Sequence, residues 1–167
     1  GGRDKGLIAH QGRPLVAGIA TPRPQGAGEV LICCRGHPYF YQHFADRILC
    51  ELVANQGPCA GITALLSAAV YSTLMLLPVD LIGAPEQVIT TLESEWHEDD
   101  TAIFLTDTEG QHSPCLRLHV DTLADCEAFF DDGGRKITGL LDKVGGRPIP
   151  VDAAWLKDAD LPASISP

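Results

Sequence analysis

The stretch T-L-M-L-L-P-V-D, residues 73–80, decides how this sequence is expected to fold. Residues 73–77 form an almost entirely apolar run of strand length, and Pro78 ends it because proline cannot donate to a sheet. An apolar run without polar alternation is typical of a strand buried on both faces. Ligands bind beyond the carboxyl ends of strands in open α/β sheets, so Asp80 lies where a site is expected.

Strands and helices are predicted to alternate around this stretch. A second apolar run, Val30–Cys34, predicts another buried strand, and a short strand is predicted at Arg47–Cys50. Helices are predicted at residues 15–20, 60–71 and 85–93. Crossovers of this length connect parallel strands, so the first half predicts a mostly parallel α/β sheet. The second half predicts an antiparallel pair at 102–106 and 115–120, helices near 122–130 and 136–144, and a short strand around 148–151.

Composition narrows the class of protein. The 167 residues are 45% hydrophobic, which suits one globular domain with a sizeable core. A net charge of −10 disfavours nucleic acid and anionic membranes as partners, although a local pocket can still bind a small anion. The uncharged stretch from Leu52 to Val79 is broken by polar residues and prolines, so it predicts a buried helix and strand rather than a membrane span.

Six cysteines show neither a C-x-x-C pair nor the spacing of a secreted scaffold, and the start of the chain carries no signal-peptide pattern. We therefore expect reduced thiols and a cytoplasmic protein. Free cysteines usually lie in cores, which favours a structural role for all six. The sequence does not determine the oligomeric state, for which a monomer is the expectation.

Four features carry candidate chemistry. Asp80 is costly to bury unpaired, so it is a candidate Mg²⁺ ligand; the alternative is an N-cap for the helix at Pro85, several residues downstream. Glu51 ends the preceding strand and would face the same crevice. The segment G-P-C-A-G, residues 57–61, offers free backbone N–H groups at a helix start, although glycine and proline also punctuate ordinary helices. Lys5 follows two glycines and can offer charge to a phosphate, or be simply solvated.

Together these segments resemble one family. G-G-R-D-K-G-L at residues 1–7, G-R-P-L at 12–15, G-P-C-A-G at 57–61 and P-V-D at 78–80 match, in order and at similar spacing, the motifs of the molybdenum cofactor guanylyltransferases. The resemblance spans nearly the whole chain and includes G-G-R-K at 133–136. It implies a Rossmann-like three-layer fold of the nucleotide-diphospho-sugar-transferase type, with residues 1–167 forming a single nucleotidyltransferase domain.

The resemblance also implies an activity: Mg²⁺-dependent transfer of GMP from GTP to molybdopterin, with pyrophosphate released. Lys5 would contact the triphosphate and Asp80 would hold the Mg²⁺, making these two the implied catalytic residues. Arg135 and Lys136 would meet the anionic end of the acceptor, or merely begin a solvated helix. The implied nucleotide-binding residues are Gly1, Gly2, Lys5, Cys33, Glu51, Gly57, Pro58 and Gly61.

Departures from the family pattern keep two alternatives open. Cys33 replaces a frequent asparagine and Glu51 an aspartate, which suggests a related enzyme that uses CTP or another acceptor. The aspartate turn, Asp80-Leu81-Ile82, lacks the family's proline. A C-terminal N-x-N-T-P segment is replaced by A-S-I-S-P at 163–167, which suggests a homologue that binds nucleotide without turnover.

One expectation concerns residues before Gly1. In the fold that the resemblance implies, a strand in the middle of the sheet precedes the glycine loop, and its loss would expose two strand edges. We therefore expect an apolar strand and the first half of that loop to precede Gly1 in the natural protein.

Overall fold

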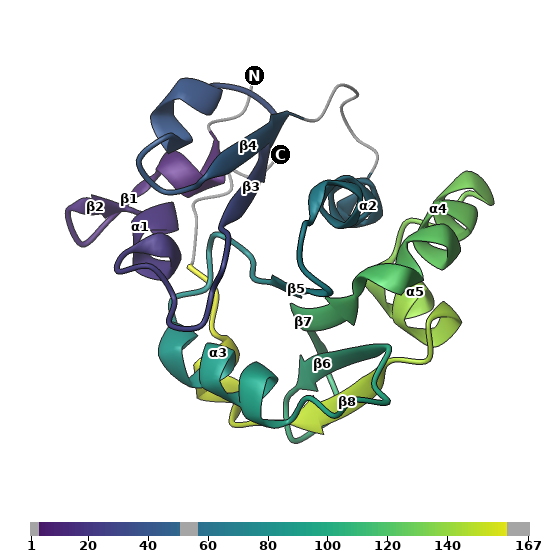
Figure 1. Ribbon diagram of the computed structural model, residues 1–167. Coiled ribbons are helices and arrows are strands. Elements are labelled where there is room, and N and C mark those ends of the chain that lie inside the picture. Colours follow the sequence, from purple (N-terminus) through teal and green to yellow (C-terminus); the bar gives the residue numbers. More distant parts are fainter. Residues whose placement is uncertain (1–3, 51–56, 160–167) are drawn as a thin grey trace.

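The structure is a computed structural model that describes residues 4–50 and 57–159 (Figure 1). A parallel pair joins β3 (Leu31–Cys34) to β4 (Arg47–Cys50). A four-stranded sheet has the order β5-β7-β6-β8. Its strands are β5 (Thr73–Leu76), β6 (Ala102–Thr106), β7 (His112–His119) and β8 (Arg147–Pro150). A short hairpin, β1 (Ala9–His10) and β2 (Arg13–Pro14), lies outside both sheets and was not expected from the sequence.

The four-stranded sheet runs mainly in one direction. β7 is antiparallel to both β5 and β6, and β8 is parallel to β6, so only β7 is reversed. The prediction of a mostly parallel sheet with an antiparallel portion in the second half is therefore confirmed. The antiparallel pair begins earlier than predicted, because β7 starts at His112 rather than at Cys115.

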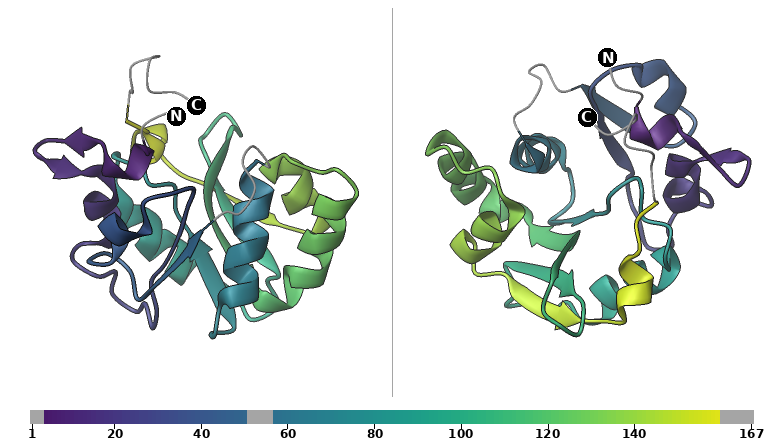
Figure 2. Two further views of the ribbon diagram at one scale, coloured as in Figure 1. Left: turned by 90° about the horizontal axis from the view of Figure 1, so that it is seen from above. Right: turned by 180° about the vertical axis from the view of Figure 1, so that it is seen from behind.

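Helices cover both faces of this sheet (Figure 2). On one face lie α2 (Pro58–Ala68), α4 (Leu123–Asp131) and α5 (Ile137–Lys143). On the other lies α3 (Pro85–Ser94), and α1 (Leu15–Ala20) contributes Ile19 to the same apolar cluster. α2 ends three residues before the predicted Tyr71, and Val70 and Tyr71 are exposed beyond it.

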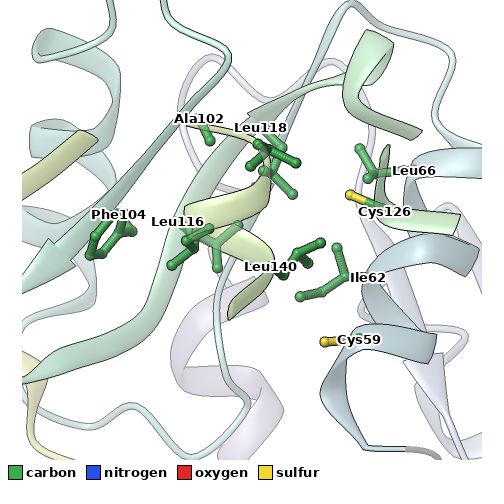
Figure 3. Close-up of a cluster of buried hydrophobic side chains, with 11 residues drawn as sticks. Cys59, Ile62, Leu66, Ala102, Phe104, Leu116, Leu118, Cys126 and Leu140 are labelled. Atoms are coloured by element: carbon green, nitrogen blue, oxygen red, sulfur yellow. The ribbon is translucent and has the colours of Figure 1, made fainter. Parts of the chain in front are cut away.

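The alternation of side chains along β6 explains the three layers. Phe104 packs with α2, α4 and α5, whereas Ile103 and Leu105 pack with Val88 and Leu92 of α3. Figure 3 shows the first cluster, in which Leu116 and Leu118 of β7 lie among residues of the three helices. A strand buried on both faces loses the polar alternation of a half-exposed sheet, as in β6, whose five residues are all buried. β3 and β5, which were predicted to be buried on both faces, are less so: all four residues of β5 are partly buried, and those of β3 alternate between partly buried and buried.

Short 3-10 helices complete the described chain, among them η1 (Lys5–Leu7), η2 (Pro38–Tyr41) and η4 (Ala153–Leu156). Within the two described ranges, no helix has the length and apolar character needed to cross a membrane. The part of the uncharged stretch that is described folds as α2 and β5.

Candidate functional site

Lys5 and Asp80 lie together at the carboxyl end of β5. The Lys5 Nζ is 3.6 Å from Oδ2 of Asp80, and their side chains are 40% and 18% exposed. Asp80 follows the last residue of β5 by four positions, and Lys5 is the first residue of η1. The structure thus brings together the two residues that the sequence singled out for phosphate and metal. Asp80 is not a helix cap, because α3 begins at Pro85 with Ala84 as its N-cap residue; that alternative was wrong.

A buried tyrosine fixes the backbone that carries Lys5. The Tyr41 hydroxyl donates to Oδ1 of Asp4, and the same oxygen accepts from the Gly6 amide at 3.2 Å. Burial and the Asp4 carboxylate raise the pKa of Tyr41, so the hydroxyl stays protonated and donates. A Cβ on Gly6 would lie 2.5 Å from the Tyr41 hydroxyl oxygen. Asp4 and Gly6 therefore position Lys5 from either side.

Asp158 is a further residue at this site, and sequence reasoning missed it. It pairs with Leu81 in an isolated antiparallel bridge, and the Ala159 amide donates to the Asp80 carbonyl at 2.8 Å. Partial burial and the charge of Asp80 raise the pKa of Asp158, while the Lys5 ammonium lowers it. One ammonium thus lies among two carboxylates, and we call Lys5, Asp80 and Asp158 the charged cluster.

Close backbone packing holds the two acidic segments together. The amides of Ile82 and Gly83 both donate to the Lys157 carbonyl, at 2.9 and 3.0 Å. A Cβ on Gly83 would lie 2.3 Å from the Trp155 carbonyl oxygen, so only glycine lets this loop approach η4. The only sequence signal for Asp158 is its place in the acidic pattern D-A-D at residues 158–160, near the carboxyl end of the chain.

Only some of the predicted nucleotide-binding residues lie within the described part of the chain. Cys33, Pro58 and Gly61 line one cavity of about 620 Å³ between β3, β5 and α2. Gly57 is the N-cap residue of α2 and has a φ of 74°, a conformation that favours glycine. Gly1, Gly2, Glu51 and the segment 163–167 lie outside the described residues.

Arg135, which Lys136 follows in the chain, lies beside the start of α2. A Cβ on Gly57 would lie 3.3 Å from the Arg135 carbonyl oxygen. The Arg135 guanidinium lies 4.3 Å from the centre of the Phe130 ring and donates to the Phe130 and Gly134 carbonyls, both at 2.7 Å. Both residues directly precede α5, and Figure 1 shows that helix across the molecule from β3 and β4. The structure thus brings Arg135 to Gly57, and it groups Lys5 with Asp80 elsewhere.

The charged cluster offers oxygen ligands to a metal ion. Mg²⁺ prefers one or two carboxylates together with phosphate oxygens and water, and Asp80 and Asp158 are two such carboxylates. Burial and the charge of Asp80 raise the pKa of Asp158, and a divalent cation would offset the second of these effects. The residues present therefore fit a magnesium ion bound jointly with phosphates.

Comparison with known proteins gives a consistent result. The family model described as "MobA-like NTP transferase domain" matches residues 1–144. A molybdenum cofactor guanylyltransferase from Ectopseudomonas mendocina is 37% identical over 170 residues, covering 99% of this chain and 83% of that protein. One from Pseudomonas paraeruginosa is 29% identical over 163 residues, covering 96% and 82%.

Solved structures share the fold. The molybdopterin-guanine dinucleotide biosynthesis protein A of Archaeoglobus fulgidus superimposes with a TM-score of 0.74 at 15% identity, over 96% of this chain and 86% of that one. A CMP:2-keto-3-deoxy-manno-octonic acid synthetase in complex with CTP gives a TM-score of 0.71 at 12% identity, over 89% and 83%. At such low identity these likenesses establish the architecture alone.

Proposed function

The chain belongs to the family of MobA-like NTP transferase domains, and from this premise we propose that it transfers GMP from GTP to molybdopterin. In this reaction a phosphate oxygen of molybdopterin attacks the α-phosphorus of GTP. The bond from that phosphorus to the bridging oxygen breaks, and pyrophosphate leaves. The products are molybdopterin guanine dinucleotide and pyrophosphate, and the enzyme is a nucleotidyltransferase.

The charged cluster is the observation that carries the assignment of residues. Lys5, held by Asp4 and Gly6, would exchange its 3.6 Å contact with Asp80 for a phosphate oxygen of GTP. Asp80 and Asp158 would hold a magnesium ion, which when bound neutralises phosphate charge and the leaving pyrophosphate. In-line phosphoryl chemistry needs positioning and charge neutralisation rather than a protein nucleophile.

We also propose residues that contact the nucleoside and the acceptor. Gly57, Pro58 and Gly61, at the start of α2, together with Cys33 would contact the nucleoside, and Gly1, Gly2 and Glu51 are predicted to complete that site. Arg135 and Lys136 would meet the anionic end of molybdopterin, close to the start of α2. A cytoplasmic monomer is our proposal for location and state; the cysteine spacing, which lacks the pattern of a secreted disulfide scaffold, supports a reducing compartment.

The activity is tested by supplying GTP or CTP with molybdopterin and magnesium, and separating the products by chromatography. We expect the guanine dinucleotide from GTP and little product from CTP. Preferential use of CTP would support the related enzyme instead, and GTP binding without product would support the homologue that lacks turnover. Either result would overturn the proposed reaction.

The assignment of residues is tested by calorimetric titration of magnesium and GTP into variants. Lys5→Ala, Asp80→Asn and Asp158→Asn should each weaken binding by about tenfold or more, because each removes a direct phosphate or metal contact. Asp132→Asn, an exposed aspartate after α4, is the matched control and should bind as the unaltered chain does. Unchanged affinity in Asp158→Asn would remove that residue from the site.

A further inference from the structure

Two cysteines lie side by side at the carboxyl ends of β3 and β4. Cys34 is the last residue of β3, Cys50 is the last residue of β4, and the two are partners in the register of the parallel pair. Neighbouring strands are about 4.8 Å apart, which lies within the Cα separation of about 4.4–6.8 Å that a disulfide bond spans. The backbone therefore holds these two residues at a separation that a disulfide can bridge.

The two thiols also interact directly. Burial raises the pKa of Cys34 most, and the Cys50 side chain raises it further through its charge and a hydrogen bond. Cys33 is not the partner of Cys50, because it pairs in register with Leu49 and successive side chains of a strand point to opposite faces. Cys34 is thus the thiol that lies against Cys50.

The two thiols differ in their access to solvent. All six cysteines lie within the described residues, and Cys50 is the exposed one among them, whereas Cys34 is buried. Cysteines that respond to oxidants are typically accessible and lie next to a second cysteine that resolves the first product. Cys59 and Cys126 belong to the core cluster and are closed to a solute, with side chains 0% exposed. Cys50 and Cys34 have the arrangement of an attacking and a resolving thiol.

Cys34 packs behind the segment that carries Lys5. Cys34 and Tyr41 belong to one apolar cluster, and the Tyr41 hydroxyl donates to Asp4. Asp4 in turn accepts from the Gly6 amide at the start of η1. A covalent bond would draw the Cys34 sulfur toward Cys50, because bonded sulfurs lie closer together than hydrogen-bonded ones. The packing around Tyr41 would then change, and with it the support of Lys5.

We propose that Cys34 and Cys50 form a reversible disulfide when the protein meets a low-molecular-weight disulfide, and that this bond loosens the contact between Tyr41 and Asp4 behind Lys5. Disulfides of proteins in reducing compartments are usually transient, and several of them sense the redox state. The proposed bond is of that kind.

The exchange proceeds in two steps, with glutathione disulfide as the oxidant. The Cys50 thiolate attacks one sulfur of glutathione disulfide, the bond between its sulfurs breaks, and one glutathione leaves as a thiolate. Cys34 then loses its proton and attacks the Cys50 sulfur, and the second glutathione leaves. The two protons of the cysteines pass to the two glutathione thiolates. Two thiols of the protein are thus oxidised, and one glutathione disulfide is reduced to two glutathiones.

The experiment incubates the folded protein with glutathione disulfide, alkylates the remaining thiols after denaturation and measures the intact mass. We expect two of the six thiols to be lost with no glutathione retained, and dithiothreitol to restore both. Amide hydrogen exchange of residues 4–8 is followed in the same samples. It should rise severalfold in the oxidised form, because Asp4 loses its support, while exchange in β6 stays constant.

Three variants identify the two thiols. Cys50→Ser should keep all of its thiols, because the attack begins at that residue. Cys34→Ala should retain one glutathione on Cys50, because no adjacent thiol displaces it. Cys33→Ala is the matched control and should form the bond as the unaltered chain does. Circular dichroism checks that each variant is folded, and Cys50→Ser, which replaces an exposed side chain, provides the test should Cys34→Ala not fold.

Several results would overturn the proposal. Glutathione that stays on Cys50 in the unaltered chain would show that Cys34 does not resolve it, and a disulfide in Cys34→Ala would assign the bond to another cysteine. Loss of more than two thiols would show that oxidation requires unfolding. Unchanged exchange in residues 4–8 would refute the link to Lys5. These measurements need no nucleotide, so their results are independent of the proposed enzymatic activity.

Discussion

Single residues explain why the motif around Lys5 has its particular letters. Asp4 accepts hydrogen bonds from the Tyr41 hydroxyl and the Gly6 amide, and Gly6 has no space for a side chain. The motif therefore combines Lys5, which we propose to contact phosphate, with two neighbours that fix its backbone. The sequence alone indicates only the lysine and the glycines before it as candidate phosphate-binding residues.

The first prediction concerns Gly6→Ala. Its Cβ would lie 2.5 Å from the Tyr41 oxygen, which forces a shift in the packing around Asp4 and Lys5. We expect a loss of about 1–3 kcal/mol in the free energy of unfolding, measured by urea denaturation, and weaker GTP binding. Gly18→Ala in α1 is the control, because a Cβ there meets nothing within 4 Å. It should stabilise the protein by about 0.5–1 kcal/mol. Equal effects of the two changes would contradict this account of Gly6.

The second prediction concerns the acidic partner of Asp80. The raised pKa of Asp158 means that the unfolded chain ionises this carboxyl at a lower pH than the folded chain does. Stability therefore falls as pH rises from the ordinary value of 3.8 through the folded value, and the deficit persists above it. Asp158→Asn should have a higher Tm than the unaltered chain at neutral pH.

This advantage of Asp158→Asn should vanish in acid below pH 3.8, where the carboxyl is protonated in both states. Thermal unfolding across this pH range measures it, with Asp132→Asn as the exposed control. A lower Tm for Asp158→Asn at neutral pH would show that its carboxylate stabilises the fold instead.

At the scale of elements, ion pairs connect segments that only tertiary structure brings together. Arg147, the first residue of β8, donates from Nε and Nη2 to both carboxylate oxygens of Asp100, at 2.9 and 2.6 Å. The same guanidinium donates to the Glu95 carbonyl at 2.6 Å. Asp100 is only 10% exposed at its side chain, and the His97 amide also donates to it. The pair thus joins the edge strand β8 to the loop between α3 and β6.

The third prediction follows from this ion pair. The hydrogen bonds from Arg147 lower the pKa of Asp100, so its contribution to stability is present above the ordinary value of 3.8 and is lost as pH falls through the lower folded value. Asp100→Asn should cost about 1–2 kcal/mol at neutral pH by urea denaturation, and the difference should shrink in acid. Asp121→Asn is the control, because that side chain is 89% exposed. A pH-independent loss would point to packing rather than charge.

At the scale of the whole molecule, the packed core and the charged cluster lie in different places. β6, with all five residues buried, and β7 form the centre of a core that is packed on both faces by helices. The charged cluster lies at the carboxyl end of β5, outside both of those packed faces, and is formed by three segments distant in the sequence. A change in the cluster can therefore alter binding without unpacking the core.

The sequence by itself determined the order of the main helices and strands and the mostly parallel α/β class, because continuous apolar runs and helical periodicity are local properties that burial imposes. It also placed Asp80 just beyond a strand end. Tertiary structure alone decided that Lys5 meets Asp80, that Gly57 lies against Arg135, and that Leu81 pairs with Asp158. Each of these contacts joins residues more than seventy positions apart, and such contacts depend on how the layers pack rather than on any pattern within one segment.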